Sequence, residues 1–377
     1  MLGGEWIVSF RFDRAAEEQF LNKPVILEVA RQCVEFAKKG YSDRHYKNRE
    51  IKCQVSWVPT EAFRAGAYVI DDGTHQVRLS YGSAIDIYRD AFVLPETCRR
   101  VLIQPEFDPI FNLLSYGNDR QDVLPAGLTP EDAKITIIRL MTTWLFLHEQ
   151  AHLLQRHGEI AKAEGITELL SHDTGIEDAP ADDHELKDRS ASVRHAFEFA
   201  ADYEAITHLL MAESIGGISE ATLWCLATGL MCMFRRFYGS SSATIGETPR
   251  GSHPHPGARM RMTMNRIEQI FALPDFAPTA KWAGGTKQAR AVMDHAVYTA
   301  DVFWHLRYLG LDARTPFLDV VVSNLAVPPS YQRDIFDAWR SVRADIVSGH
   351  LGVGEGVVMF LRAPSVVGVR AEPFASV

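Results

Sequence analysis

Five consecutive residues, His148-Glu149-Gln150-Ala151-His152, combine two imidazoles and a carboxylate at a spacing suited to metal chemistry. On an α-helix, positions i and i+4 lie about 40° apart and one turn along, so both imidazoles face the same point. Such a pair can bind one Zn2+ at ~2.0–2.1 Å, and Glu149 can take a proton from a water at the metal. The ordinary alternative is a pair of surface histidines, but the apolar run WLFL directly before the motif predicts a buried site.

A zinc site of this kind needs a third protein ligand, and the best candidate lies on the next predicted helix, over residues 190–211. Glu198 and Asp202 are spaced i, i+4 and share one face of that helix. Glu198 is the expected ligand, and Asp202 is expected to accept a hydrogen bond from a ligand imidazole. A solvated acidic face is the alternative, which the neighbouring phenylalanines and alanines argue against. His195 and Glu204 are the fallback ligands.

Residues that follow the motif more closely are not expected to join the site. If the motif helix continues, His157 is rotated about 140° away from His152, and Glu159 lies ~10 Å further along the axis. The third histidine of a metzincin would stand six residues after the second motif histidine, where this chain has Gly158. We expect the motif helix to end near Gly158.

The motif HEQAH followed by EFAAD resembles the pattern of gluzincin peptidases, and it is similar to the HtpX and CAAX-prenyl-protease group. That group also carries a His-Pro with an Arg six residues after the His, as His253-Pro254 and Arg259 do here. The resemblance covers residues 144–261. Those enzymes are embedded in membranes, whereas this sequence shows no predicted span, and in general layout the chain looks more like the Lit-type phage-exclusion peptidases.

The resemblance implies a role for each matching residue. The zinc ligands would be His148, His152 and Glu198, and Glu149 would activate the water and pass its proton to the leaving amine. Asp202 would orient a ligand histidine. His253 or Arg259 would stabilise the oxyanion or order the site. Independently of the resemblance, Arg259 could fix the His-Pro loop by a bidentate contact with a carboxylate, for which Asp202 is one candidate. The alternative for the last two residues is a structural role in a Pro-rich turn.

The elements around these residues predict an α+β fold, mostly helical and zincin-like, with a small N-terminal sheet over the motif helix. Thr129-Pro130-Glu131-Asp132 is a strong helix start, because it combines a capping Thr, a Pro at the first position and acids in the first turn. Strands are expected at 5–12, 51–58, 67–70 and 76–81, and further helices at 24–39, 84–92, 220–238, from about 258, 286–308 and 329–348. We divide the chain into an N-terminal α+β part of the peptidase unit (1–128), a helical zinc-binding core (129–275) and a C-terminal helical region (276–377).

Composition narrows the class of protein. The chain has 377 residues, 46% hydrophobic and 23% charged, with a formal net charge of −9, which argues against a dedicated nucleic-acid binder. The start shows no signal-peptide pattern, and no apolar run reaches the ~20 residues of a membrane span. The five cysteines are irregularly spaced, as expected of buried thiols in a reducing compartment. We therefore expect a cytoplasmic protein without an integral membrane segment, whose oligomeric state the sequence leaves open.

These observations predict a zinc-dependent endopeptidase that acts on a protein or peptide substrate. An extended substrate could pair with an edge strand, for which residues 76–81 are the candidate. The acidic stretch 162–189 would be a lid or a plain surface loop. One alternative is a zinc hydrolase of non-peptide amides, an amidohydrolase. Another is a regulatory or binding protein with a vestigial metal site, against which the intact Glu149 argues because a structural site needs no base.

Overall fold

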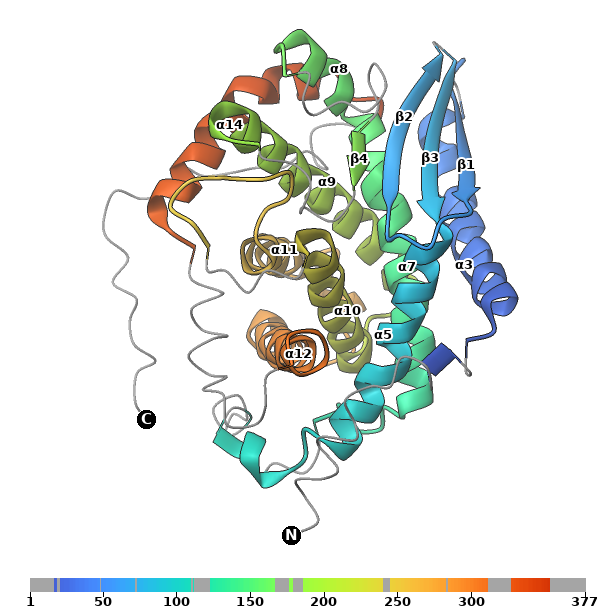
Figure 1. The fold of residues 1–377 in the computed structure, drawn as a ribbon, viewed down its shortest axis with the longest axis vertical. Coiled ribbons are helices and arrows are strands. Elements are labelled where there is room, and N and C mark those ends of the chain that lie inside the picture. The colour runs from blue at the N-terminus through green and yellow to red at the C-terminus, as the bar shows by residue number, and fades with distance from the viewer. Residues whose placement is uncertain are drawn as a thin grey trace.

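The structure is a computed structural model that describes residues 17–18, 21–47, 49–71, 73–109, 111, 123–166, 176–178, 186–239, 245–282, 284–310 and 327–352. These residues are mostly helical, with one small sheet (Figure 1), so the fold is α+β in its broad class. The helices are α3 (Lys23–Ala37), α4 (Asp43–Tyr46), α5 (Tyr81–Arg100), α7 (Pro130–Leu154), α8 (His157–Ala163), α9 (Asp188–Ser214), α10 (Glu220–Tyr238), α11 (Pro256–Phe271), α12 (Gly285–Tyr308) and α14 (Pro329–Gly349). A π-helical turn, η1 (Lys38–Ser42), follows α3, and η2 (Pro105–Phe107) and η5 (Ala277–Thr279) are 3-10 turns.

The described sheet has the strand order β1-β3-β2-β4, with β1 (Lys52–Val58), β2 (Ala65–Asp71), β3 (Thr74–Ser80) and β4 (Ile176–Asp178). Strands β2 and β3, expected at 67–70 and 76–81, form an antiparallel hairpin, and β1 joins β3 in parallel. The strand predicted for an edge, β3, is therefore interior, and that prediction is wrong. Its physical cause is the parallel pairing of β1, which covers the side of β3 that a lone hairpin would leave open. The edges of the described sheet are β1 and β4.

Helix α7, which carries the HExxH motif, begins as predicted. The Thr129 side chain accepts a hydrogen bond from the backbone N–H of Asp132 at 3.1 Å, and Pro130 opens the helix. The helix ends at Leu154, earlier than the predicted stop at Gly158, because Arg156 adopts a left-handed conformation with φ 56°. The chain turns there and starts α8 at His157. Left-handed backbone is uncommon outside glycine, so the residue types gave no signal for this turn.

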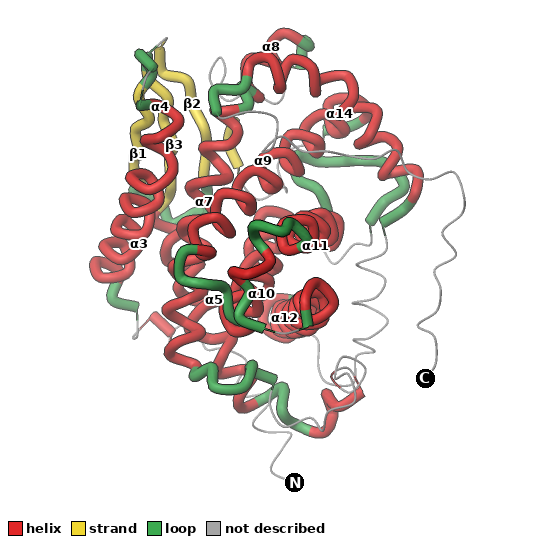
Figure 2. The backbone as a smooth tube through the Cα atoms, turned by 180° about the vertical axis from the view of Figure 1, so that it is seen from behind, coloured by secondary structure: helices red, strands yellow, loops and turns green. Residues whose placement is uncertain are grey.

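Helix α7 packs against β2 and β3 of the sheet and against α3, α5, α9 and α10. Figures 1 and 2 show the sheet at one end of the molecule, beside α3 and α7. The largest hydrophobic core joins residues of the sheet, α7, α10, α11 and α12, and a second core joins α8, α14 and the first half of α9. Helix α9 contributes to both cores, since Phe197 lies in the second and Ile206 in the first. The stretch of α9 that carries Glu198 and Asp202 lies where the two cores meet.

Several other elements differ in length from the prediction. Helix α3 does not stop at Gly40 but continues through the π-helical turn, and α5 extends from Tyr81 to Arg100 with Pro95 inside it. The predicted strand at 5–12, most of the acidic stretch 162–189 and the tail beyond residue 352 lie outside the described residues. Within that acidic stretch, β4 and the start of α9 are described. The division into three parts stays a prediction.

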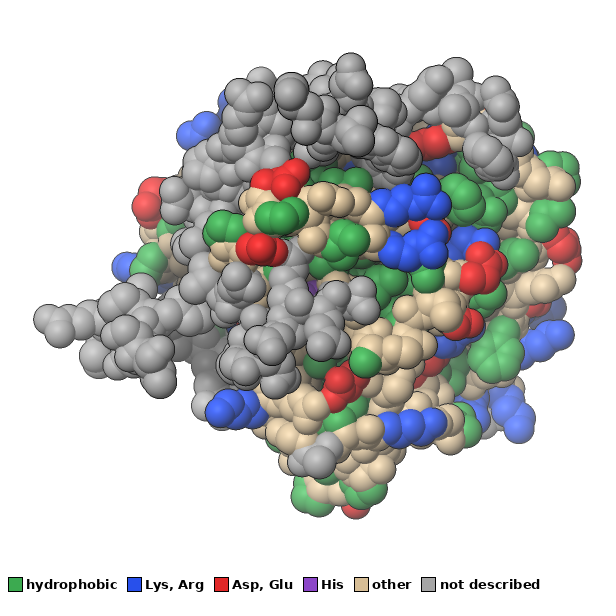
Figure 3. All heavy atoms as spheres, turned by 90° about the horizontal axis from the view of Figure 1, so that it is seen from below, with side chains coloured by type: hydrophobic (Ala, Val, Ile, Leu, Met, Phe, Trp, Pro, Cys, Tyr) green, Lys and Arg blue, Asp and Glu red, His purple; other side chains and the backbone are tan. Residues whose placement is uncertain are grey.

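Three further findings concern the helices, the surface and the cysteines. Among the described residues, no helix combines the length and the apolar character needed to cross a membrane. Figure 3 shows one face of the molecule, on which acidic, basic and apolar side chains are interspersed. Cys53, Cys98, Cys225 and Cys232 are buried and Cys33 is half-buried, so the thiols are used mainly as small core residues.

Candidate metal centre

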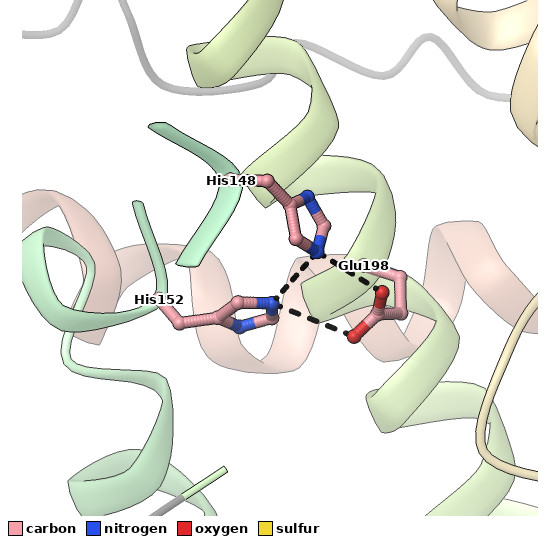
Figure 4. Close-up of side chains that lie close together, drawn as sticks. All are labelled: His148, His152 and Glu198. Carbon is pink, nitrogen blue, oxygen red and sulfur yellow. Dashed lines mark hydrogen bonds and ion pairs between the residues drawn. The ribbon is translucent and has the colours of Figure 1, made fainter. Parts of the chain in front are cut away.

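His148, His152 and Glu198 meet in the interior of the protein, the first two from α7 and the third from α9 (Figure 4). The two Nε2 atoms lie 3.3 Å apart. One Glu198 oxygen lies 3.4 Å from Nε2 of His148, and the other lies 3.5 Å from Nε2 of His152. A tetrahedral zinc ion with bonds of ~2.0–2.1 Å separates its ligand atoms by about 3.3–3.4 Å. Each of these three separations, two of which involve different Glu198 oxygens, is therefore close to the distance between two ligand atoms of such an ion.

The ring of His148 is held by a carboxylate behind it. Its Nδ1 lies 3.0 Å from Oδ1 of Asp202, so Nδ1 donates to that carboxylate and Nε2 is the nitrogen that faces Glu198. Burial alone would raise the pKa of Asp202, but the charge of Arg259 and the hydrogen bond from His148 hold that pKa below its ordinary value. Asp202 is thus an ionised acceptor, the state that orients a metal-binding histidine.

Two buried arginines face the carboxylates of the site. Arg259 donates to both oxygens of Asp202 at 2.7 and 2.8 Å, the contact that the sequence suggested, and its Nη2 lies 3.4 Å from Glu198. Arg194 lies 3.0 Å from Glu198, and its Nε donates to the carbonyl of Ser252 at 3.4 Å. The sequence analysis missed Arg194, although its i−4 spacing from Glu198 on one helix was a usable signal. The two arginines thus offset the negative charges of Glu198 and Asp202.

Glu149 and its neighbours are shielded from bulk solvent. Glu149, His148 and Glu198 are fully buried, and the Trp144 ring stacks on His148 with centroids 5.0 Å apart. This packing matches the apolar run that precedes the motif. Because these groups are buried away from bulk water, charges interact more strongly there than in water, so a cation and a nearby base would influence one another strongly.

His253 lies close to the site but outside the ligand group. Its Nδ1 is 2.9 Å from the Ser252 hydroxyl, and its ring stacks on Phe237 at 5.4 Å. Phe237 also lies 6.4 Å from the His148 ring, centroid to centroid. The His-Pro loop therefore reaches the aromatic wall of the site, and Pro256 opens α11, which carries Arg259.

The fallback ligands have other partners. His195 lies 2.9 Å from the Tyr331 hydroxyl and 3.1 Å from the Gly251 carbonyl, and burial lowers its pKa to about 3. Glu204 accepts a hydrogen bond from Gln155 at 2.7 Å. Glu159 pairs with Arg156, away from the ligand group. His157 is not a ligand, but the turn at Arg156 brings its Nδ1 to 2.8 Å from Nδ1 of His152, which helical geometry had excluded.

Replacing Arg259 tests whether it orders the site. In Arg259→Leu, two buried carboxylates lose a counter-charge, and we expect the metal-free protein to lose about 3–5 kcal/mol of unfolding free energy. Urea denaturation measures this loss. The control is Arg261→Leu, an exposed arginine on the same helix, for which we expect a change within about 0.5 kcal/mol. Equal stability of the two variants would show that Arg259 does not stabilise the carboxylates.

Comparisons of the chain with protein-family models, with curated proteins and with solved structures find no match. The assignment of the centre therefore rests on its own geometry: a buried group of two histidines and a glutamate that could hold a metal ion.

Proposed function

We propose that the protein is a zinc-dependent peptidase, with His148, His152 and Glu198 as zinc ligands. The observation that carries the proposal is the convergence of these three buried side chains, whose donor atoms lie 3.3–3.5 Å apart, with Glu149 on the same turn of α7. Nitrogen and carboxylate donors suit zinc. Three protein ligands leave the fourth position for water or substrate, as in catalytic sites. The resemblance of the motifs to those of gluzincins supports the same assignment.

Each residue around the site has a separate role in the proposed hydrolysis. Bound zinc would polarise the scissile carbonyl and make a water more acidic. Glu149 takes the proton of the attacking water and gives it to the leaving amine. Asp202 keeps the hydrogen of His148 on Nδ1, and Arg259 holds Asp202 in place. Arg194 fixes the carboxylate of Glu198 and ties it to the loop that carries His253.

An extended peptide is the substrate that the sheet favours. A free strand edge offers backbone N–H and C=O groups to a peptide, and among the described strands β4 is the edge next to β2, the strand that packs on α7. Figure 1 shows β4 on the side of the sheet toward α9, the helix that carries Glu198. We therefore assign substrate pairing to β4 in place of the interior strand β3.

Cleavage of an unfolded protein mixture tests the function. Zinc-loaded protein should release new peptide N-termini, detected by mass spectrometry, and removal of zinc with a chelator should abolish the release until zinc is restored. Cleavage of small acylated amides without cleavage of peptides would support an amidohydrolase instead. Zinc binding without hydrolysis of either substrate class would contradict the proposal and support a binding protein.

A further inference from the structure

The second proposed zinc ligand, His152, differs from His148, whose Nδ1 faces Asp202, in what stands behind its ring. Its Nδ1 instead meets another histidine nitrogen, Nδ1 of His157, at 2.8 Å. One of these nitrogens donates and the other accepts, because a hydrogen bond needs one hydrogen. Which one donates decides whether Nε2 of His152 presents a lone pair or a hydrogen toward Glu198 and His148.

The partners of Gln155 decide this direction. The side-chain nitrogen of Gln155 lies 3.1 Å from the carbonyl oxygen of Ala200, which can only accept, and 2.7 Å from a carboxylate oxygen of Glu204. The amide oxygen of Gln155 therefore faces Nε2 of His157 at 3.1 Å. This oxygen accepts, so Nε2 of His157 carries its hydrogen, and Nδ1 of the neutral His157 ring accepts from Nδ1–H of His152.

The chain of hydrogen bonds continues to the segment after α14. Nε2 of His350 lies 3.1 Å from the same Glu204 oxygen, and Nδ1 of His350 accepts from the backbone N–H of Gly352 at 2.7 Å. His350 is therefore a donor to Glu204. The backbone N–H of Leu351 also donates to the carbonyl of Leu154, the last residue of α7, at 2.8 Å. The C-terminal segment is thus bonded to the end of the helix that carries both histidine ligands.

We infer that four residues position the second zinc ligand by holding the hydrogen of His152 on Nδ1 and its lone pair on Nε2. We call them the His152 relay: His157, Gln155, Glu204 and His350. They are positioning residues, since they act on the metal only through His152. The inference rests on the proposed zinc site and adds to it a role for the C-terminal helical region, whose His350 ends the relay.

The relay side chains lie in the interior, and their hydrogen bonds and packing fix the orientation of each ring and amide. His157, Gln155 and Glu204 are fully buried, and the His157 ring stacks on Phe197 at 4.3 Å. A Cβ at position 352 would lie 2.4 Å from Cε1 of His350, so only glycine fits there without moving that ring. The two ligand histidines thus have separate supports, a carboxylate–arginine pair for His148 and the relay for His152.

The main test replaces His157 in the 377-residue chain and measures zinc affinity by competition with a chelator. His157→Phe keeps a flat ring but removes the acceptor, and we expect about 10–100-fold weaker zinc binding. In His157→Asn, the side-chain oxygen can accept from His152, so affinity should stay within a few-fold of the original protein. His305→Phe is the control, because His305 is an equally buried imidazole bonded within α12, away from the relay.

A spectroscopic measurement separates positioning from mere stability. In metal-free protein with 15N-labelled histidine, NMR should show His152 as the Nδ1–H tautomer, with the signal assigned through a His152→Asn variant. We expect His157→Phe to change that tautomer. Gln155→Met provides a second variant should His157→Phe fold poorly. It removes the acceptor of His157, and we expect it to shift the His152 tautomer and to weaken zinc binding in the same direction.

The outcomes distinguish the relay from the zinc site itself. Absence of zinc binding by the original protein would overturn the proposed site. Zinc binding by the original protein, with unchanged affinity and an unchanged His152 tautomer in His157→Phe or Gln155→Met, would overturn the relay alone. Weaker binding in both variants, with rescue by His157→Asn and no effect of His305→Phe, would support it.

Discussion

Glu149→Gln should retain zinc and its fold yet lose hydrolytic activity by about 100-fold or more. The amide that replaces the carboxylate cannot take a proton from water, so the attacking nucleophile is no longer generated. The change preserves the volume of a fully buried side chain, and α7 is fixed by its Thr129 cap and by packing on both sides. The rate of peptide cleavage at saturating substrate, with zinc content measured in parallel, gives the result.

The matched control for this variant is Glu159→Gln, an acid that pairs with Arg156 on the turn after α7 and takes no part in the ligand group. Its activity should equal that of the original protein. Activity of Glu149→Gln close to that of the control would show that another group acts as the base. Loss of zinc from Glu149→Gln would point to Glu149 as part of the ligand set.

The second large effect is the loss of zinc affinity expected when the glutamate ligand is removed. Glu198→Ala should bind zinc more than about 100-fold more weakly, beyond the 10–100-fold expected for groups that only orient a ligand. Two histidines alone hold the ion poorly, and Arg194 without its carboxylate partner repels it. Glu198→Gln removes the charge while keeping the shape, and should lose affinity in the same direction. Chelator competition and elemental analysis of the purified variants measure both.

The control for the second prediction is Glu213→Ala on the same helix. Glu213 pairs with Arg139 at 2.8 Å near the surface, so its loss removes a glutamate from α9 without touching the centre. Zinc affinity of Glu213→Ala should match that of the original protein. Stoichiometric zinc at unchanged affinity in Glu198→Ala would mean that a different side chain is the third ligand.

Local signals in the sequence predicted the elements that carry the centre. The Thr129 cap and the apolar run before the motif located α7, and the i, i+4 spacing of Glu198 and Asp202 placed both acids on one face of α9. These features depend on residues close together in the chain, which is why they can be read without the fold. Because a zinc site of this kind needs a third ligand, we also expected α9 to face α7.

Features that depend on tertiary structure could not be predicted in the same way. Strand β3 is interior because β1 pairs with it in parallel. The residue types of the two strands do not reveal which strands will be neighbours in the sheet. Arg156 adopts a left-handed backbone although it is not glycine, so the helix ends there. The prediction assumed a continuous helix and therefore placed His157 too far from His152. His350 meets Glu204 only because α14 packs against α8 and α9.

Anomalous diffraction from crystals of the zinc-loaded protein, collected on both sides of the zinc absorption edge, tests the zinc site most directly. We predict one strong peak per chain, about 2.0–2.2 Å from Nε2 of His148, from Nε2 of His152 and from a carboxylate oxygen of Glu198. The fourth position should hold a water and no protein atom. A peak elsewhere, a fourth protein ligand or the absence of a peak between these side chains would contradict the account.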